Sequence, residues 1–473
     1  MSRQLLRNSF SGLSGMALHK LVHLVTMIVL ARMLGAEQFG IYAFVGAMVF
    51  FFGFLTDLGM ERVLTRELSA KPHEARVLLG TALWLRLGLG FLAAGIGALV
   101  GWVLALDRVT FVCLVLALAT LPFGFDLLAR AYFQSRLEIR HYYRITLAGS
   151  ATFLLLVGLC WWWQGSVVAV FALGLANALL FSALFLRAVL LRVGISPFAE
   201  LGRARSLLRE GFQIGLLALL FMTALRVDQI LLFQLRGAEE AGQYAAAVRL
   251  TEALGMFSEA VMLSLFPLLA ASHRSNPKAF RHRYQLGFRY LAATGTLLAL
   301  ACSYLAPDLL QVVFGQKYAA AWPAAVFLSW NLLLSYLGAV YVNVFLIECW
   351  YRLLLLVSAL SVAVNIAFNL LWIPAYGSAG AAAATLLSSA VGFASWFVFP
   401  ATRSVLVDCV RSSAPAITAG VLSACVGVAL LQWRGTHFAL LSLILYVVLL
   451  VAVGGLARSD LRRLYASSPS VPG

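Results

Sequence analysis

The chain has 473 residues, of which 62% are hydrophobic and only 11% are charged, and its mean hydropathy is +0.92. Soluble globular domains are about 45–50% apolar and about 25% charged. The composition therefore excludes a soluble globular protein and predicts an all-α polytopic membrane protein. The crossings are expected to be helical, because backbone polar groups inside a bilayer must find their hydrogen bonds within the segment.

Apolar stretches of about 20 residues, each long enough to cross a hydrocarbon core of about 30 Å, recur along the whole chain. Hydropathy predicts fourteen of them. In chain order the expected spans are residues 10–34, 39–60, 77–106, 109–132, 145–163, 166–186, 212–235, 243–270, 290–314, 320–347, 353–372, 379–399, 414–433 and 436–456.

The distribution of Lys and Arg predicts the orientation of these spans. With the N-terminus inside, 26 of the 35 Lys and Arg fall in or beside cytoplasmic segments and five fall at the outer face. This alternation follows the positive-inside rule, so both termini are expected in the cytoplasm. The net charge of +16 is then an orientation signal rather than a sign of nucleic-acid binding. The first apolar segment lacks a small-residue cleavage site and is expected to stay as a span.

One short phrase occurs twice in the chain. Residues 34–43 read LGAEQFGIYA and residues 236–245 read RGAEEAGQYA, an offset of 202 residues. This offset places the seventh span over the first and the eighth over the second, with both copies at an outer turn. Such a repeat indicates a duplicated unit of six spans in the same orientation. The phrase itself is expected to be structural, because its glycines permit a tight reversal.

The longest connection between spans is basic, contains Gly and Pro, and divides six spans from eight. The predicted organisation is an N-terminal lobe at residues 1–190, a cytoplasmic linker at 191–211, a C-terminal lobe at 212–402, and two further helices with a cytoplasmic tail at 403–473. Halves of this kind usually face each other across a central cavity, which they expose alternately to the two sides of the membrane.

Charged side chains within the predicted spans are candidates for function, because a charge at the bilayer centre costs roughly 2.5–3.5 kcal/mol. Lys20 and His23 lie three residues apart on one face of the first span. The repeat-equivalent seventh span carries Arg226 and Asp228, which are two apart and cannot pair within the helix. Arg86 lies in the third span. We predict that Lys20, His23, Arg86 and Arg226 line a cavity.

Other charged residues have a simpler structural interpretation. Arg249 and Glu252 are three apart in the eighth span, and Asp126 and Arg130 are four apart in the fourth, so each pair can form within its own helix. Asp57, near the inner end of the second span, is expected to cap a helix or to contact a loop arginine. Snorkelling toward the inner face is an alternative for Arg86.

No sequence pattern points to catalysis. There is no phosphate-binding loop, zinc motif or nucleophile triad. The six cysteines are scattered, without the spacing of a metal site or a disulfide framework. No catalytic residue, metal or cofactor is predicted, and a transporter without its own ATPase is the expected class. A glycan polymerase or ligase would need an extended outer loop, whereas all the outer loops are short.

Two stretches carry a resemblance to a known family. LARMLGAEQFGIYAF with DLGMERVLTRELSA, and later RVDQILLFQLRGAEEAGQYAAAVRL, resemble the polysaccharide transporter family of Wzx-type O-antigen flippases. That family belongs to the multidrug/oligosaccharidyl-lipid/polysaccharide (MOP) superfamily, with the MATE exporters and the lipid II flippases. The resemblance implies two six-helix lobes, a V-shaped and typically cationic cavity, and two extra C-terminal helices. By position, Lys20, Arg86 and Arg226 would supply the cationic groups.

The resemblance also implies a task, which is to move undecaprenyl-pyrophosphate-linked oligosaccharide from the cytoplasmic to the periplasmic leaflet of the bacterial inner membrane. Arg and Lys can bind the pyrophosphate by charge-assisted hydrogen bonds. Uphill transport would use a coupling ion, H⁺ or Na⁺, or the membrane potential, with Asp228, Glu252 and Arg249 as candidate coupling residues. Expected partners are the lipid-linked oligosaccharide, membrane lipids and glycan polymerase or assembly proteins, but no nucleic acid. The alternative is an exporter of small cationic drugs or metabolites.

Overall fold

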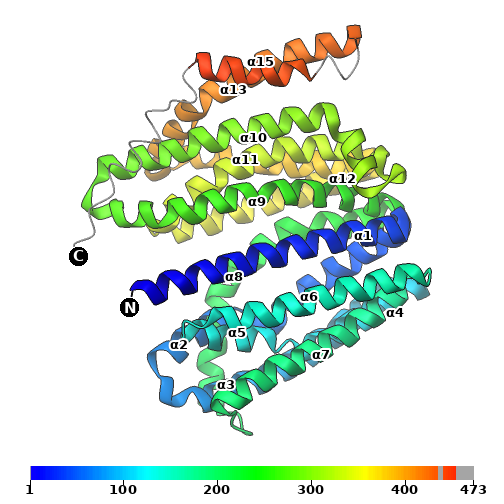
Figure 1. The fold of residues 1–473 in the computed structure, drawn as a ribbon, viewed down its shortest axis with the longest axis vertical. Coiled ribbons are helices and arrows are strands. Elements are labelled where there is room, and N and C mark those ends of the chain that lie inside the picture. The colour runs from blue at the N-terminus through cyan, green and yellow to red at the C-terminus, as the bar shows by residue number, and fades with distance from the viewer. Residues whose placement is uncertain (1, 435–439, 454–473) are drawn as a thin grey trace. The chain divides into compact units, whose positions relative to one another are not determined.

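The protein is described by a computed structural model that covers residues 2–434 and 440–453 (Figure 1). Throughout this part of the chain the regular secondary structure is helical. Ten of the helices in it are long and apolar enough to cross a membrane. The prediction of an all-α polytopic membrane protein is confirmed, whereas the count of fourteen spans stays a prediction. The expected last span, 436–456, and the tail beyond it lie partly outside the described residues.

The chain divides into two compact units, residues 1–242 and 243–473. The helices of the first unit, up to the beginning of α9, are α1 (Ser2–Asp57), α2 (Met60–Ala70), the 3₁₀ turn η1 (Pro72–Glu74), α3 (Ala75–Val103), α4 (Arg108–Leu118), η2 (Leu121–Phe123), α5 (Asp126–Ser135), α6 (Ile139–Trp162), α7 (Val167–Val193) and α8 (Leu201–Arg236).

The helices of the second unit are, in chain order, α9 (Ala238–Ser275), α10 (Pro277–Phe314), η3 (Gln316–Ala321), α11 (Trp322–Ile347), α12 (Tyr351–Ser395), η4 (Trp396–Val398), α13 (Pro400–Arg434) and α15 (Leu441–Ala452). Its core contains aromatic and aliphatic side chains of α10, α11 and α13, with Phe288, Val340 and Leu406 fully buried among them. Apolar burial of this kind within the helix layer is expected of a packed membrane domain.

The two copies of the repeated phrase begin at equivalent helix breaks. α1 is interrupted at Gly35, where φ is 71°, and Gly237, where φ is 89°, directly follows the last residue of α8. A left-handed φ is readily adopted only by glycine. The positions are 202 residues apart, so the structure repeats the same glycine-dependent break that the sequence repeat predicts.

Each copy of the phrase also packs directly on the other. A Cβ atom added to Gly40 would lie 1.7 Å from the carbonyl oxygen of Ala238, and one added to Gly242 would lie 1.8 Å from the carbonyl oxygen of Ala36. The two contacts are related by the same offset of 202 residues. The expected structural role is therefore observed at the glycine break in each copy. The phrase has a second structural role that was not expected, which is the close contact between the two copies.

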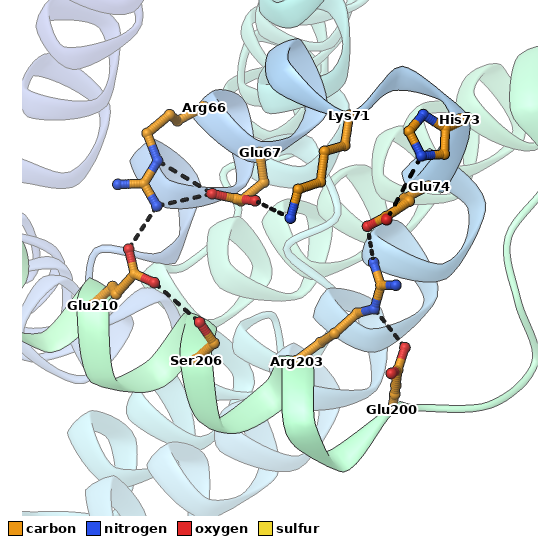
Figure 2. A network of polar contacts seen from close by, with 9 residues as sticks. All are labelled: Arg66, Glu67, Lys71, His73, Glu74, Glu200, Arg203, Ser206 and Glu210. Atoms are coloured by element: carbon orange, nitrogen blue, oxygen red, sulfur yellow. Dashed lines mark hydrogen bonds and ion pairs between the residues drawn. The ribbon is translucent and has the colours of Figure 1, made fainter.

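Next to α2, an ion-pair network joins the beginning of α8 to the turn before α3 (Figure 2). α2 is amphipathic and buries Val63, Leu64 and Leu68. On its polar side the Arg66 guanidinium lies 2.6 Å from the carboxylate of Glu210. The other members of the network are Glu67, Lys71, His73, Glu74, Glu200, Arg203 and Ser206. These contacts hold the first three turns of α8, which precede the span expected at 212–235.

Candidate functional site

A break in the predicted fourth span shapes the interior of the first unit. α4 ends at Leu118, the turn η2 follows, and α5 begins at Asp126. Pro122 lies in this break, where proline cannot donate the hydrogen bond that a continuous helix needs. α3 approaches the break closely, since a Cβ atom added to Gly90 would lie 2.4 Å from the Cα of Pro122. The break places Asp126 at the first turn of a new helix inside the unit.

A cavity of about 820 Å³ lies within this first unit. Its walls come from α1, α3, α6 and α7, from the break around Pro122, and from α2, α5 and α8. The aromatic side chains that line it are Phe50, Phe54, Phe123, Phe153, Phe181 and Phe185. The charged side chains that line it are Asp57, Glu61, Arg62, Arg86, Asp126 and Arg130. Three carboxylates and three guanidinium groups make the lining formally neutral, beside a wall of aromatic rings.

Arg86 is the most buried cation of this lining, with 6% of its surface exposed. Its Nε has no hydrogen-bond partner within the described residues. The carboxylates of Asp126 and Asp57 attract the Arg86 guanidinium electrostatically. Gly124 has no side chain, and the guanidinium occupies the space beside it. A Cβ atom added to Gly124 would lie 2.3 Å from the Arg86 Nη2. A buried charge with an unmet donor is costly, so a ligand that offers acceptor oxygens would be bound favourably.

The carboxylates of the cavity are partly engaged. Asp57 accepts hydrogen bonds from the backbone N–H groups of Gly59 at 3.2 Å and Glu61 at 3.1 Å, so its expected capping role is confirmed. The Glu61 carboxylate lies 3.0 Å from Nε of Arg130. The pairing expected from the sequence, Asp126 with Arg130, is therefore wrong. Packing of α2 against α5 brings the Glu61 carboxylate to Arg130 from another helix.

The remaining predicted cavity residues are differently placed. Lys20 is half-buried and His23 is exposed, and neither is among the residues that line this cavity. Arg226 lies with its guanidinium carbon 5.4 Å from the ring centroid of Phe50, which does line it. Asp228 is 4% exposed and accepts a hydrogen bond of 2.8 Å from the backbone N–H of Gln229. The structure therefore brings Arg86 and Arg226, through Phe50, to the same region of the unit.

The expected pair of Arg249 and Glu252 is confirmed. The Arg249 guanidinium and the Glu252 carboxylate form an ion pair one helical turn apart in α9. A pair of this kind is an ordinary feature of a helix surface and stabilises an isolated helix by about 0.2–0.5 kcal/mol. The pairing weakens the case for Arg249 and Glu252 as coupling residues.

Three carboxylates of the cavity were not expected there from the sequence. Asp57, Glu61 and Asp126 lie near helix ends, where capping or local pairing is the usual interpretation. The available signal was their position beside glycine-containing breaks, Asp57 two residues before Gly59 and Asp126 two residues after Gly124. A break changes the direction of the chain, so side chains next to it can face the cavity.

The family of the chain follows from its sequence over more than half its length. A family described as polysaccharide biosynthesis protein matches residues 5–273. The chain belongs to this polysaccharide biosynthesis protein family. The resemblance noted in the sequence is thereby confirmed, and the cavity lies entirely within the matched part. No curated protein matches the sequence.

Solved structures show the same fold. Lipid II flippase MurJ in an inward closed conformation has a TM-score of 0.72 and 13% identity over 97% of this chain and all of its own. An inward-facing multidrug resistance MATE family transporter of the MOP superfamily has a TM-score of 0.64 and 16% identity over 83% of this chain and 96% of its own. A MOP superfamily transporter from Pyrococcus furiosus has a TM-score of 0.58 and 14% identity over 86% and 96%. These likenesses establish the fold of the MOP superfamily.

Proposed function

We propose that the protein is a flippase that moves undecaprenyl-pyrophosphate-linked oligosaccharide, a repeat unit of O-antigen or exopolysaccharide, between the leaflets of a bacterial inner membrane. The observation that supports it most is a buried guanidinium with an unmet donor, Arg86, in a cavity of a polysaccharide biosynthesis family member. A pyrophosphate offers several anionic oxygens, which match the planar fork of an arginine. Transfer between leaflets needs no covalent step.

In this proposal Arg86 binds the pyrophosphate, and the aromatic side chains beside it contact apolar faces of the sugar or the lipid. Arg226, Lys20 and His23 are proposed as further cationic groups on the substrate path. Asp228 is the preferred candidate for coupling to H⁺ or Na⁺, because it is buried and does not share the helical pair of Arg249 with Glu252. A buried carboxylate in a membrane helix is a reasonable candidate for such a role.

A complementation experiment tests the proposal. The gene is expressed in a host that lacks its own translocase for the same repeat unit, and surface glycan is measured together with the amount of protein in membranes. Arg86→Gln should abolish glycan display at an unchanged protein level, and Arg86→Lys should restore part of it. The matched control is Arg108→Gln, an exposed arginine at the other end of the unit in α4, which should display normal glycan. Normal display by Arg86→Gln would contradict the proposed role of Arg86.

The second candidate function is export of small cationic compounds. The carboxylates of Asp57, Glu61 and Asp126 in the cavity favour it, since a cationic ligand needs anionic partners. Ethidium efflux from cells that express the protein distinguishes the two functions. Efflux that disappears in Asp126→Asn, without rescue of glycan display by the unmodified protein, would establish the exporter and overturn the flippase.

A further inference from the structure

The connection between α7 and α8 is fastened along the outside of α3. Residues 194–200 are non-helical and follow the first three turns of α3. The backbone N–H of Ser196 donates to the carbonyl of Arg76 at 3.0 Å, and the N–H of Glu200 donates to Oγ1 of the buried Thr81 at 3.1 Å. Gly80 permits this approach, because a Cβ atom there would lie 2.4 Å from the Ser196 carbonyl oxygen. The connection is therefore a fixed part of the first unit.

The depth of this connection in the membrane follows from Trp84. The Trp84 indole N–H donates to the carbonyl of Pro197 at 2.8 Å. α3 has 29 residues and is about 43 Å long, so it exceeds a hydrocarbon core of about 30 Å by about 6 Å at each end. Trp84 lies about 14 Å along the helix from its first residue. Arg76, which accepts the hydrogen bond from Ser196, lies only about 2 Å along the helix. The connection that contacts both Arg76 and Trp84 therefore crosses the boundary between head groups and hydrocarbon, where tryptophan is enriched.

The side chains that this connection presents outward are apolar. Phe198 is 77% exposed and Leu201 is 85% exposed, although both are large hydrophobic residues. The indole of Trp84 beside them is also half-exposed. Neighbouring exposed apolar side chains rimmed by charge are typical of a surface that binds a membrane or a partner. Because their depth coincides with a bilayer boundary, the lipid itself is the occupant that fits.

The charges around these apolar residues are positive. Arg76, Arg187 and Arg205 are exposed and form no ion pair within the described part of the chain. Other basic residues nearby are already engaged, since Arg192 pairs with Glu138 and Arg203 with Glu74. Exposed arginines beside inserted apolar side chains are the pattern of an interfacial segment on anionic lipid.

We infer that residues 194–201, with Trp84, form an interfacial membrane anchor. Phe198 and Leu201 insert into the apolar boundary of the leaflet that the positive-inside pattern assigns to the cytoplasm. Arg76, Arg187 and Arg205 contact anionic phospholipid head groups around them. The anchor holds the lead-in of α8 at a fixed depth, just before the helix enters the membrane. This inference is independent of the substrate of the transporter.

Nitroxide accessibility tests the anchor without any transport assay. Single cysteines replace Phe198 or Leu201 in a chain whose exposed cysteines, Cys349 and Cys425, are changed to serine. The protein is spin-labelled and reconstituted in vesicles of phosphatidylcholine and phosphatidylglycerol. Labels at both positions should be relaxed more strongly by oxygen than by a water-soluble nickel chelate. The matched control, His73→Cys, starts from a side chain that is 79% exposed in the neighbouring turn η1 and should show the reverse.

Two outcomes would overturn the anchor. Nickel accessibility at positions 198 and 201 equal to that at position 73 would mean that these side chains face water. Protection from both oxygen and nickel would mean that a protein surface, such as a second copy of the chain, covers them. The head-group contacts have their own test, in which the depth measured at position 198 should decrease in vesicles of phosphatidylcholine alone. An equal depth in both lipids would contradict the proposed contacts of the arginines with anionic head groups. Normal glycan display by Arg86→Gln, which would contradict the proposed role of Arg86, would leave these measurements unchanged.

Discussion

Gly40 and Gly242 lie against each other at equivalent positions of the two copies of the repeated phrase. A Cβ atom added to Gly40 would lie 2.8 Å from the backbone nitrogen of Gly242, and one added to Gly242 would lie 2.9 Å from the nitrogen of Gly40. The contact is reciprocal, and its two halves are related by the offset of 202 residues between the two copies. Two helices can approach this closely only where both lack side chains.

Gly40→Ala and Gly242→Ala are each expected to destabilise the protein. The added methyl group meets backbone atoms, which cannot rotate away as a side chain can. Overpacking is therefore expected to lower the free energy of unfolding by about 1–3 kcal/mol. Melting of the protein in detergent measures the loss. Gly46→Ala is the control in the same helix, because nothing lies within 4 Å of its Cβ position. It should leave the melting temperature equal or slightly higher, since alanine favours a helix over glycine. Equal melting of all three variants would contradict the close contact.

The repeated phrase could be recognised from sequence because many of its positions recur at one offset. The glycine breaks at Gly35 and Gly237, the kink at Pro122 and the pair of Arg249 with Glu252 all follow from local rules about φ, proline and helix spacing. The contact of Gly40 with Gly242 does not follow from such rules. It depends on how two helices cross, and no local signal specifies the partner of a small residue.

The site was predictable only in part for a similar reason. Arg86 was identified because a cation deep in a span is unusual. Its surroundings were missed, because Asp57 and Asp126 each have an ordinary local role at a helix end. The breaks around Gly59 and Gly124 bring them together with Arg86 in one cavity. The match between Arg130 and Glu61 likewise depends on the packing of α2 on α5, which hydropathy does not describe.

Gly124→Ala should impair the proposed function while the fold is kept. The new methyl group would lie 2.3 Å from Nη2 of Arg86, and the guanidinium is the flexible end of its side chain, so the arginine should move rather than the backbone. A displaced guanidinium should reduce glycan display several-fold in the complementation assay. Gly88→Ala, in α3 and with nothing within 4 Å of its Cβ position, is the control and should display normal glycan. Unchanged display by Gly124→Ala would argue against a role that depends on the position of Arg86.

The contact of Arg66 with Glu210 should depend on pH in one direction. The hydrogen bond from Arg66 lowers the pKa of the Glu210 carboxyl below its ordinary value. A carboxyl group with a lowered pKa stabilises the fold fully above its unfolded pKa, about 4.3 for glutamate, and loses this effect as the pH falls through the folded pKa. The melting temperature of the unmodified protein should exceed that of Glu210→Gln at neutral pH. The difference should begin to shrink at about pH 4.3 and vanish only below the lowered pKa of the Glu210 carboxyl. The control Glu239→Gln, at an exposed position in α9, should show no such difference. A difference that grows on acidification would contradict the assignment.

Asp408 should be required for the stability of the second unit. Its carboxylate is 2% exposed and accepts two hydrogen bonds of 2.7 Å from Arg281 and one of 2.7 Å from the hydroxyl of Tyr284, so it joins α13 to α10. Asp408→Ala leaves the buried Tyr284 hydroxyl without its acceptor, which costs about 1–3 kcal/mol. Asp408→Asn should cost less, because the amide oxygen still accepts one bond. Asp308→Ala, an exposed aspartate near the other end of α10, is the matched control. If Asp408→Ala melted at the same temperature as Asp308→Ala, this bidentate contact would not hold α13 on α10.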